Sequence, residues 1–330
     1  MIRAIALISG GLDSILAARV VMDLGIEVRG VTYVTEFSAV DVEGYRKSVM
    51  DIASQLGIEM TTIDISAEFI DIIKRPFYGF GAHVNPCIDC KILMLKITKD
   101  MMAEAGASFI ITGEVLGERP MSQRMDALNA IENKSGLKGY LVRPLSAKLL
   151  KPTAPEETGL LDRNKLLGIS GRSRKPQLAL AGKYGLRKYF TPAGGCLLTD
   201  PGFARRLRDL MDHDCLDIGN IRLLKYGRHF RFNGKTKFVI GRNQDENMAI
   251  MGLMRDGDLV VEPEGYPGPI GIIRGSAETD TIMRASGLLV RYTRKKEEKE
   301  ARARYWSAKD AKTSITVKPA GLNELEACRI

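Results

Sequence analysis

The sequence predicts an α/β protein in which a parallel sheet with helices on both faces is followed by a smaller α/β domain. Apolar strand-like runs alternate with helical patterns through the first half of the chain. Near residue 215 this pattern gives way to short β runs separated by turn residues. A chain of 330 residues is long enough for one large domain or two modest ones. We therefore expect domains at residues 1–215 and 216–330.

The first half contains the elements of the parallel sheet. Apolar or β-branched runs predict strands at residues 2–9, 27–35, 59–66 and 108–114. Apolar residues with helical spacing predict helices at residues 14–25, 45–57 and 90–107. This β-α-β-α order places helices on both faces of a parallel sheet. Ligands of such sheets bind beyond the carboxyl ends of the strands.

The second half is expected to be more varied. Residues 143–206 are rich in Pro, Gly and basic residues, which predicts irregular structure with short helices. The Asn233-Gly234 pair predicts a hairpin turn. A helix is expected at residues 244–257, followed by strands at 258–265 and 270–275. Residues 284–306 are expected to form a charged helix, with a partly ordered basic tail after it.

The charge balance favours a polyanionic partner. The chain has 49 Lys and Arg residues against 40 Asp and Glu, a net charge of +9. Nucleic acid is the commonest partner of so basic a protein, although a merely soluble basic protein has the same balance. No apolar run approaches the roughly 20 residues that span a bilayer, and the N-terminus does not resemble a signal peptide. We expect a cytoplasmic protein without a membrane partner.

A glycine-rich corner follows the first predicted strand. It reads Ser9-Gly10-Gly11-Leu12-Asp13-Ser14 and leads into a helix. Paired glycines let the backbone approach a ligand, and the helix start directs free N–H groups at the same point. Two serine hydroxyls add donors. The spacing is neither that of a Walker A loop nor that of a dinucleotide-binding loop. The sequence predicts a phosphate cradle, with a plain capped turn as the simpler alternative.

This corner resembles the SGGxDS PP-loop of the ATP pyrophosphatase superfamily. The resemblance implies an adenine nucleotide alpha hydrolase-like fold and cleavage of ATP between its α- and β-phosphates, with AMP attached to a carbonyl oxygen. It implies that Ser9, Gly10, Gly11 and Ser14 hold the pyrophosphate part. Asp13 is then the catalytic anion that helps to hold Mg²⁺ or orients the attacked group.

A second block resembles 4-thiouridine synthetases. In "TGEVLGERPMSQ" the residues that match are Thr112, Gly113, Glu114, Leu116, Gly117, Ser122 and Gln123. Glu118 departs from the pattern because the family has glutamine there. "RPL" at residues 143–145 also matches. Gly113 is expected to allow close approach to the adenosine of ATP. The resemblance implies a tRNA sulfurtransferase, with 4-thiouridine favoured over 2-thiouridine.

Three cysteines are candidate sulfur or metal ligands. Cys87 and Cys90 form a C-x-x-C at the start of a helix, where free N–H groups are expected to lower the thiol pKa. Cys196 lies beside Gly194 and Gly195 and could supply a third sulfur. Three thiolates leave one iron of a 4Fe-4S iron–sulfur cluster open for an extra sulfide, and several tRNA thiolases hold such clusters. A persulfide and disulfide relay, or zinc completed by His83 or Cys215, are the alternatives. Outside the zinc alternative no role is expected for Cys215, and none is expected for Cys328.

Residues 228–275 resemble the R domain of the NFACT ribosome-quality-control proteins, and residues 278–293 and 317–322 extend the resemblance to nearly the end of the chain. The match includes a basic-aromatic strand and "VIGRNQDEN" at residues 239–247. Leu259-Val260 and Pro267-Gly268-Pro269 depart from the family pattern. Basic side chains neutralise phosphates, and exposed aromatic rings stack on bases. Phe230 and Phe232 are expected either to stack or to lie in the core. The candidate RNA-binding residues are Arg228, Arg231, Lys235, Lys237 and Arg242.

Together these features predict an ATP-dependent tRNA uridine thiolase. AMP activates a uracil oxygen, which sulfur held at Cys87, Cys90 and Cys196 replaces. The expected partners are tRNA and a sulfur donor, either inorganic sulfide or a cysteine desulfurase, and a homodimer is compatible with the sequence. One alternative is another PP-loop nucleotidyl-activating enzyme with structural zinc, of the queuosine-precursor-synthase type. The other is a non-catalytic RNA-binding adaptor that uses ATP as a switch.

Overall fold

The computed structural model describes residues 2–38, 42–190 and 196–330. The chain divides into two compact units, Met1–Thr199 and Asp200–Ile330, and each is described by itself. The predicted boundary after residue 215 lies inside the second unit. The assignment of functions to the two predicted domains stays a prediction. Among the described residues, no helix is both long enough and apolar enough to cross a bilayer.

The first unit contains the predicted parallel sheet. Its strands run in the order β3-β2-β1-β4-β5, and β1 pairs in parallel with both β2 and β4. Four of the five strands match the predicted positions, and the short β5 is an addition. The strands are β1 (Arg3–Leu7), β2 (Glu27–Val34), β3 (Met60–Asp64), β4 (Phe109–Ile111) and β5 (Leu141–Val142).

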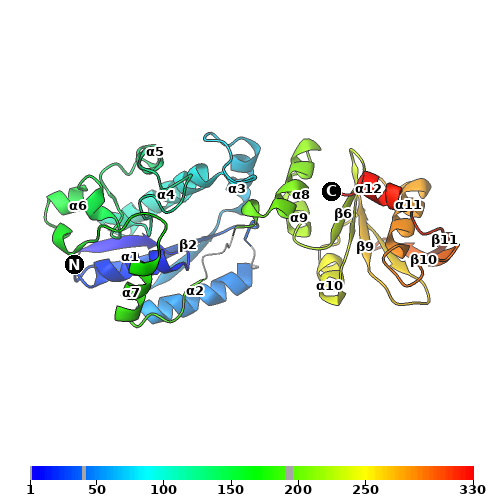
Figure 1. Ribbon diagram of the computed structural model, residues 1–330, viewed down its shortest axis with the longest axis horizontal. Coiled ribbons are helices and arrows are strands. Elements are labelled where there is room, and N and C mark those ends of the chain that lie inside the picture. Colours follow the sequence, from blue (N-terminus) through cyan, green and yellow to red (C-terminus); the bar gives the residue numbers. More distant parts are fainter. Residues whose placement is uncertain (1, 39–41, 191–195) are drawn as a thin grey trace. The chain divides into compact units, whose positions relative to one another are not determined.

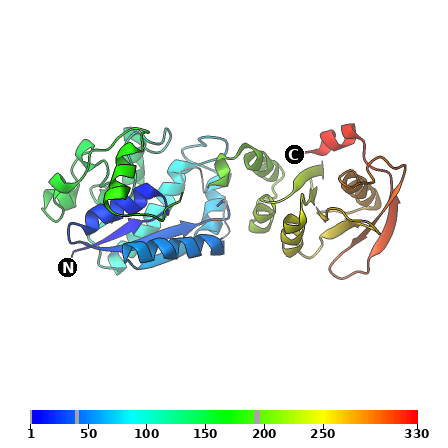
Figure 2. The same cartoon turned by 60° about the horizontal axis from the view of Figure 1, so that its bottom comes forward.

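Helices cover both faces of this sheet, as predicted. Alternate residues of β1 point to opposite faces, so that Ala4 and Ala6 pack under one helical layer while Ile5 packs under the other. Figures 1 and 2 show α1 and α7 side by side in both views. One layer contains α1 (Leu12–Met22), α2 (Val42–Leu56) and α7 (Lys175–Lys183). The other contains α4 (Cys87–Glu104) and α5 (Met125–Ser135).

The strand order reverses at β1. The chain proceeds outward from β1 to β2 and β3, and then returns to β4 on the other side of β1. Ligands of doubly wound sheets bind at such a reversal, beyond the carboxyl ends of the strands. The glycine-rich corner follows β1 and Gly113 follows β4, so both lie at this point. Residues 143–190 add irregular structure with short helices, among them α6 (Ala154–Glu157). α3 (Ser66–Lys74) precedes α4.

The second unit is built on an antiparallel sheet. Its strands run in the order β11-β10-β8-β9-β7-β6, and the predicted turn at Asn233-Gly234 joins β6 to β7. The strands are β6 (Arg228–Asn233), β7 (Thr236–Ile240), β8 (Leu259–Pro263), β9 (Gly271–Arg274), β10 (Ala301–Trp306) and β11 (Thr313–Val317).

Helices also cover both faces of the second sheet. On β7, Phe238 and Ile240 pack in one core while Val239 packs in the other. Figure 1 shows α10 and α11 on opposite sides of the sheet. The helices are α8 (Pro201–Asp212), α9 (Ile218–Leu223), α10 (Gln244–Gly252), α11 (Thr279–Val290) and α12 (Leu322–Cys328).

The predicted charged helix over residues 284–306 is wrong beyond its beginning. α11 ends at Val290, and residues 301–306 form β10. Ala301 and Ala303 are buried there, while the side chains of Arg302 and Arg304 pair with Glu264 and Glu262 near β8. This period of two is a strand pattern that the high charge obscured. The predicted tail is likewise wrong, because it forms β11 and α12.

Candidate active site

The glycine-rich corner is locked against the segment that ends at Phe190. Gly10 has φ +78°, and its carbonyl accepts a hydrogen bond of 2.8 Å from the backbone N–H of Phe190. A Cβ on Gly10 would lie 2.3 Å from the Phe190 ring. Glycine is therefore required here both for its positive φ and for the close approach of this ring.

Hydroxyl groups stabilise the corner. The Ser14 hydroxyl donates to the carbonyl of Gly11 at 2.8 Å, and its Oγ lies 3.4 Å from that of Ser9. The Tyr45 hydroxyl donates to the carbonyl of Ser9 at 2.9 Å. Gly11 immediately precedes α1, so the free N–H groups of this helix face the corner. The local geometry is that of an anion-binding cradle.

Gly113 packs directly on the start of α1. A Cβ there would lie 2.4 Å from the backbone nitrogen of Ser14, so no side chain fits without moving the corner. Gly113 also lines a cavity of about 200 Å³ together with Ser9, Gly11 and Asp13. The predicted contact with adenosine stays a prediction, and the structure adds a packing reason for glycine.

A larger cavity of about 390 Å³ adjoins the same corner. Its wall includes Ser9, Gly11 and Asp13 of the corner, and it also includes all three candidate cysteines. Lys91 and Arg119 line both cavities. The structure thus brings the sequence-predicted phosphate cradle and the sequence-predicted sulfur residues to one space. The cysteines on its wall are Cys87, Cys90 and Cys196.

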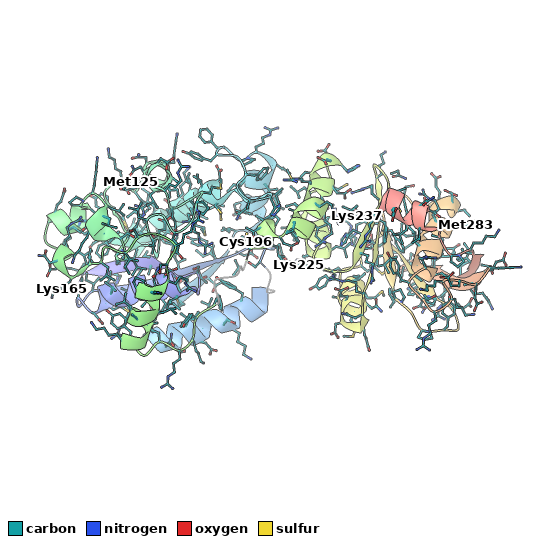
Figure 3. All side chains as sticks on the ribbon, in the orientation of Figure 1. Met125, Lys165, Cys196, Lys225, Lys237 and Met283 are labelled. Carbon is teal, nitrogen blue, oxygen red and sulfur yellow. The ribbon has the colours of Figure 1, made fainter. Side chains whose placement is uncertain are left out.

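Two separate segments position the cysteines. Cys87 and Cys90 lie in the first turn of α4. Cys196, labelled in Figure 3, pairs in an isolated antiparallel bridge with Ser38, which follows β2 in the chain. The next residue along, Leu197, donates its N–H to the carbonyl of Phe37 at 2.8 Å. Gly194 and Gly195, expected to lend flexibility, lie outside the described residues.

The thiols differ from expectation in their acidity. Burial raises the pKa of Cys87 and Cys90, and it raises the pKa of Cys196 to about 11, so the predicted lowering is wrong. Desolvation of the thiolate outweighs the nearby cation of Lys91. All three cysteines are free thiols. A bound metal or cluster would have to displace their protons.

The three thiols are suitable donors for a sulfur-ligated group, but their side chains are not gathered closely enough to hold one. Three soft thiol donors on one cavity wall match the chemistry of iron–sulfur or zinc sites. In the described parts of the chain, no group of three or more His, Cys, Asp or Glu side chains is placed close enough to hold a metal ion. Cys215 donates to the carbonyl of His213 in the second unit, and Cys328 is buried.

Charged side chains with individual unpartnered atoms lie at the phosphate cradle. Asp13, Glu118 and Arg174 each present a buried side-chain atom without a hydrogen-bond partner to the larger cavity. The hydroxyl of Ser122, which is 0% exposed, is also unpartnered. Burial raises the pKa of Asp13, and burial followed by the charge of Asp13 raises the pKa of Glu118. Buried polar atoms without partners are costly, so this cluster indicates a polar ligand.

A buried ion-pair network supports the wall from behind. Arg143 donates to Glu114 and to Glu132, both at 2.9 Å, and Lys91 also pairs with Glu114. Burial alone would raise the pKa of Glu114, but Lys91 and Arg143 lower it to about 2. The "TGE" and "RPL" motifs therefore meet in space. Lys91 belongs to this network and directly follows Cys90, so the network holds the chain next to that cysteine.

The predicted RNA-binding residues lie in the second unit, mostly with partners inside it. Arg231 and Lys237 both bind Asp209 of α8, at 2.6 Å and 3.1 Å, and Lys237 (labelled in Figure 3) is only 6% exposed. Burial lowers the pKa of Lys237 to about 8. Arg242 pairs with Glu246. The role of these residues in RNA binding stays a prediction.

The remaining residues of this set differ among themselves. The Arg228 guanidinium lies 4.4 Å from the centroid of the Tyr292 ring, and Lys235 is exposed near the hairpin turn. Phe230 is 0% exposed and belongs to the core, which decides the alternative left open for it. Phe232 packs against the same core.

Several site residues were missed by the sequence analysis. Lys91 directly follows Cys90, and Arg119 follows Glu118 within the quoted motif, so both were adjacent to a recognised signal. Tyr45 begins a predicted helix that showed no site signal, and Arg174 and Phe190 come from segments without a recognisable motif. Only the fold brings these three residues to the cavity.

Two protein-family models match separate stretches of the chain. Residues 2–148 match the family described as thiamine biosynthesis protein (ThiI). Residues 227–329 match the family described as NFACT protein RNA binding domain. The two matches correspond to the parallel sheet and to the antiparallel sheet respectively.

Individual relatives agree with the first match. The chain is 24% identical over 266 residues to the tRNA-specific 2-thiouridylase MnmA of Listeria monocytogenes serotype 4a (strain HCC23), covering 76% of this chain and 71% of the relative. The chain is thus a distant homologue of tRNA-thiolating enzymes.

Two solved structures are similar at low TM-scores. One is described as the crystal structure of a 4-thiouridine synthetase–RNA complex with bound ATP; it is 18% identical with a TM-score of 0.39, and the match covers 68% of this chain and 52% of that one. The other is described as the U34-tRNA thiolase NcsA from Methanococcus maripaludis with its [4Fe-4S] cluster; it is 15% identical with a TM-score of 0.35, covering 68% and 70%. At these scores neither carries an argument about this chain.

Proposed function

We propose that this chain is an ATP-dependent tRNA uridine thiolase. The premise is that it joins a ThiI-like PP-loop ATP pyrophosphatase domain to a C-terminal NFACT-R RNA-binding domain. The observation that supports this most strongly is the cavity of about 390 Å³ shared by the PP-loop and three cysteines. Thiolation needs an activated uracil and a sulfur atom within reach of each other. One cavity lined by both groups meets that need.

In the first step, a uracil carbonyl oxygen attacks the α-phosphate of ATP and pyrophosphate leaves. The N–H groups at the start of α1 and the hydroxyls of Ser9 and Ser14 bind the pyrophosphate part. Arg119 and Arg174 lie near Asp13 and balance negative charge that develops on the phosphates. Mg²⁺, which the carboxylates of Asp13 and Glu118 would help to hold, would supply further charge neutralisation on the leaving group.

In the second step, sulfur held at the cysteines replaces the adenylated oxygen and AMP leaves. Cys87, Cys90 and Cys196 are the proposed ligands of an iron–sulfur cluster, which would supply an open iron for an additional sulfide. The alternative is a persulfide that a cysteine desulfurase transfers to one of these cysteines. As its outer sulfur passes to the uracil, a second cysteine forms a disulfide with the first, and an external thiol reduces that disulfide. Inorganic sulfide can act as donor only in the cluster route. Lys91 lines both cavities at the PP-loop, the larger of which the cysteines also line.

The product is either 4-thiouridine or 2-thiouridine. The match to the ThiI family and the "TGE-x-LG" block favour the first. The similarity to 2-thiouridylases keeps the second as a candidate. Mass spectrometry of tRNA nucleosides from a deletion strain distinguishes them, because one thionucleoside should disappear. An unchanged thionucleoside profile would remove the thiolase proposal.

The two steps can be separated by substitution. Asp13→Ala should abolish adenylation of tRNA while tRNA binding persists. Cys196→Ser should keep adenylation, measured as tRNA-dependent release of AMP and pyrophosphate, and stop sulfur transfer. Loss of both steps in both variants would contradict the proposed division of labour between PP-loop and cysteines.

The nature of the cysteine site has its own test. Iron, sulfide and zinc analysis of anaerobically purified protein should find iron and sulfide in the wild type and loss of both in Cys87→Ser. One zinc without iron would favour a PP-loop enzyme with structural zinc. Formation of ADP, or no turnover, would favour an RNA-binding adaptor that uses ATP as a switch.

A further inference from the structure

The loop between α3 and α4 presents an aromatic ring to solvent. Phe77 is 77% exposed, the highest value among the exposed large hydrophobic residues of the described chain, and Phe80 on the same loop is 37% exposed. A ring so exposed contributes little buried area to folding. Exposed aromatic groups that cluster on one segment typically mark an interaction site.

The loop is nevertheless well ordered by hydrogen bonds. The carboxylate of Asp89 accepts from the backbone N–H of Phe77 at 3.1 Å and from that of Tyr78 at 3.0 Å. Tyr78 packs against the core between α4 and α5, and its ring meets the Phe77 ring edge-on, with 5.0 Å between the ring centroids. The ring of Phe77 is therefore held outward by a fixed backbone, and its exposure does not come from a loose loop.

Asp89 ties this ring to the cysteine site. Asp89 is the residue between Ile88 and Cys90 in the C-x-x-C segment. Its hydrogen bonds therefore attach the loop to the helical turn that contains the proposed sulfur ligands. Farther along the loop, Val84 donates its N–H to the carbonyl of Leu198, close to Cys196 in the chain. Asn85 lines the 390 Å³ cavity itself. Phe77 thus belongs to a rigid segment that leads to the rim of the site.

The surroundings of the ring are cationic. The ammonium of Lys134 on α5 lies 5.4 Å from the centroid of the Phe77 ring. Lys74 and Arg75, both exposed, immediately precede the loop. A ring beside cations matches the chemistry of unpaired RNA, in which bases stack on aromatic groups and phosphates pair with lysine or arginine. A purely apolar protein segment would gain nothing from these charges.

We propose that Phe77 is a stacking platform for an unpaired base of the tRNA substrate, next to the cysteine site, with Lys134 contacting a neighbouring phosphate. This inference rests on the proposed thiolase function and adds an RNA contact in the first unit. It gives the PP-loop domain a means of holding the target nucleotide near the cysteines, independently of the NFACT-R domain.

The experiment is a titration of the full chain with fluorescein-labelled, unmodified tRNA transcripts, followed by anisotropy. Phe77→Ala should weaken tRNA binding about 5- to 100-fold, the range expected for loss of one stacked base. Phe77→Trp should restore binding. Phe77→Leu, which keeps an apolar side chain but has no π-face, should remain weak. Equal binding by the wild type and all three variants would overturn the proposal. Full binding by Phe77→Leu, with Phe77→Ala and Phe77→Trp both weak, would overturn it as well.

Salt dependence separates the two contacts. Lys134→Gln should reduce the slope of log Kd against log salt by about one phosphate contact, whereas Phe77→Ala should leave the slope unchanged. A slope change in Phe77→Ala would contradict stacking. Leu160→Ala removes another exposed apolar side chain of the first unit, 41% exposed, and should bind tRNA like the wild type.

The outcome is distinguishable from failure of the proposed function. Wild-type protein that binds tRNA without releasing AMP and pyrophosphate contradicts the thiolase proposal and leaves the stacking result to be judged on the affinities. Wild-type protein that turns over normally, with Phe77→Ala unchanged in tRNA affinity and in KM for tRNA, contradicts the platform alone.

Discussion

The contact between Gly10 and Phe190 makes the phosphate corner sensitive to a single methyl group. Gly10→Ala places a Cβ 2.3 Å from the ring and also strains a backbone with φ +78°. We expect ATP affinity, measured by calorimetric titration, to fall at least tenfold. Gly25→Ala is the matched control, because Gly25 has φ +79° but no atom within 4 Å of its Cβ. It should cost only the backbone strain of about 1–2 kcal/mol and leave ATP binding intact. Equal loss of ATP affinity in both variants would contradict the role assigned to Phe190.

Arg174 is the second residue whose role can be isolated. Its Nε is buried without a hydrogen-bond partner at the cavity that contains Asp13. Arg174→Ala should weaken binding of pyrophosphate and ATP by about 10- to 150-fold, as expected for a charge-assisted hydrogen bond of about 1.5–3 kcal/mol. Arg172→Ala removes an exposed arginine two residues away and should have no effect. Unchanged pyrophosphate affinity in Arg174→Ala would place the phosphate elsewhere.

At the scale of elements, Glu114 joins α4 to the end of β4 and to the segment after β5. Its pKa of about 2 lies below the ordinary value of 4.5, so its contribution is fully present above pH 4.5 and is lost as the pH falls from 4.5 toward 2. Glu114→Gln should lower the free energy of unfolding at pH 7 by up to about 3–5 kcal/mol, because the buried Arg143 loses one of its two carboxylate partners and the partly buried Lys91 loses its own. It should also flatten the pH dependence between 4.5 and 2.

The control for Glu114 is an exposed carboxylate of the same unit. The side chain of Glu59 is 81% exposed and lies 3.6 Å from Arg29. Glu59→Gln should change the free energy of unfolding by less than about 1 kcal/mol, since exposed ion pairs contribute little. Chemical denaturation followed by circular dichroism, repeated across this pH range, compares the two. A steep acid transition retained by Glu114→Gln would argue against the network.

The elements also show where prediction from the sequence stopped. The parallel strands and their helices were predictable because each has a clear period of hydrophobicity. β10 was not, because Arg302 and Arg304 made residues 301–306 look like the continuation of a charged helix. Their carboxylate partners, Glu264 and Glu262, come from a segment about forty residues earlier. Only strand pairing reveals that these charges lie along one face of a sheet.

At the scale of the whole molecule, each unit has its own core and should unfold by itself. Differential scanning calorimetry of the full chain should resolve two transitions. Asp209→Asn removes the carboxylate that binds Arg231 and Lys237, and it should lower only the transition of the second unit. Asp212→Asn, on the exposed side of the same helix α8, should leave both transitions in place. A single transition that shifts as one would contradict independent units.

The sequence by itself determined the class of the protein: a parallel sheet with a PP-loop after its first strand, and a second basic domain. These follow from hydrophobic periods and short motifs, which are local properties of the chain. The tertiary structure decided which residues share the site. It brought Cys196, Arg174 and Phe190 to a corner formed by residues 9–14, and it buried the predicted RNA contact Lys237 against Asp209. Sequence spacing carries no information about such long-range contacts, because they depend on how separate segments pack at the carboxyl ends of the strands.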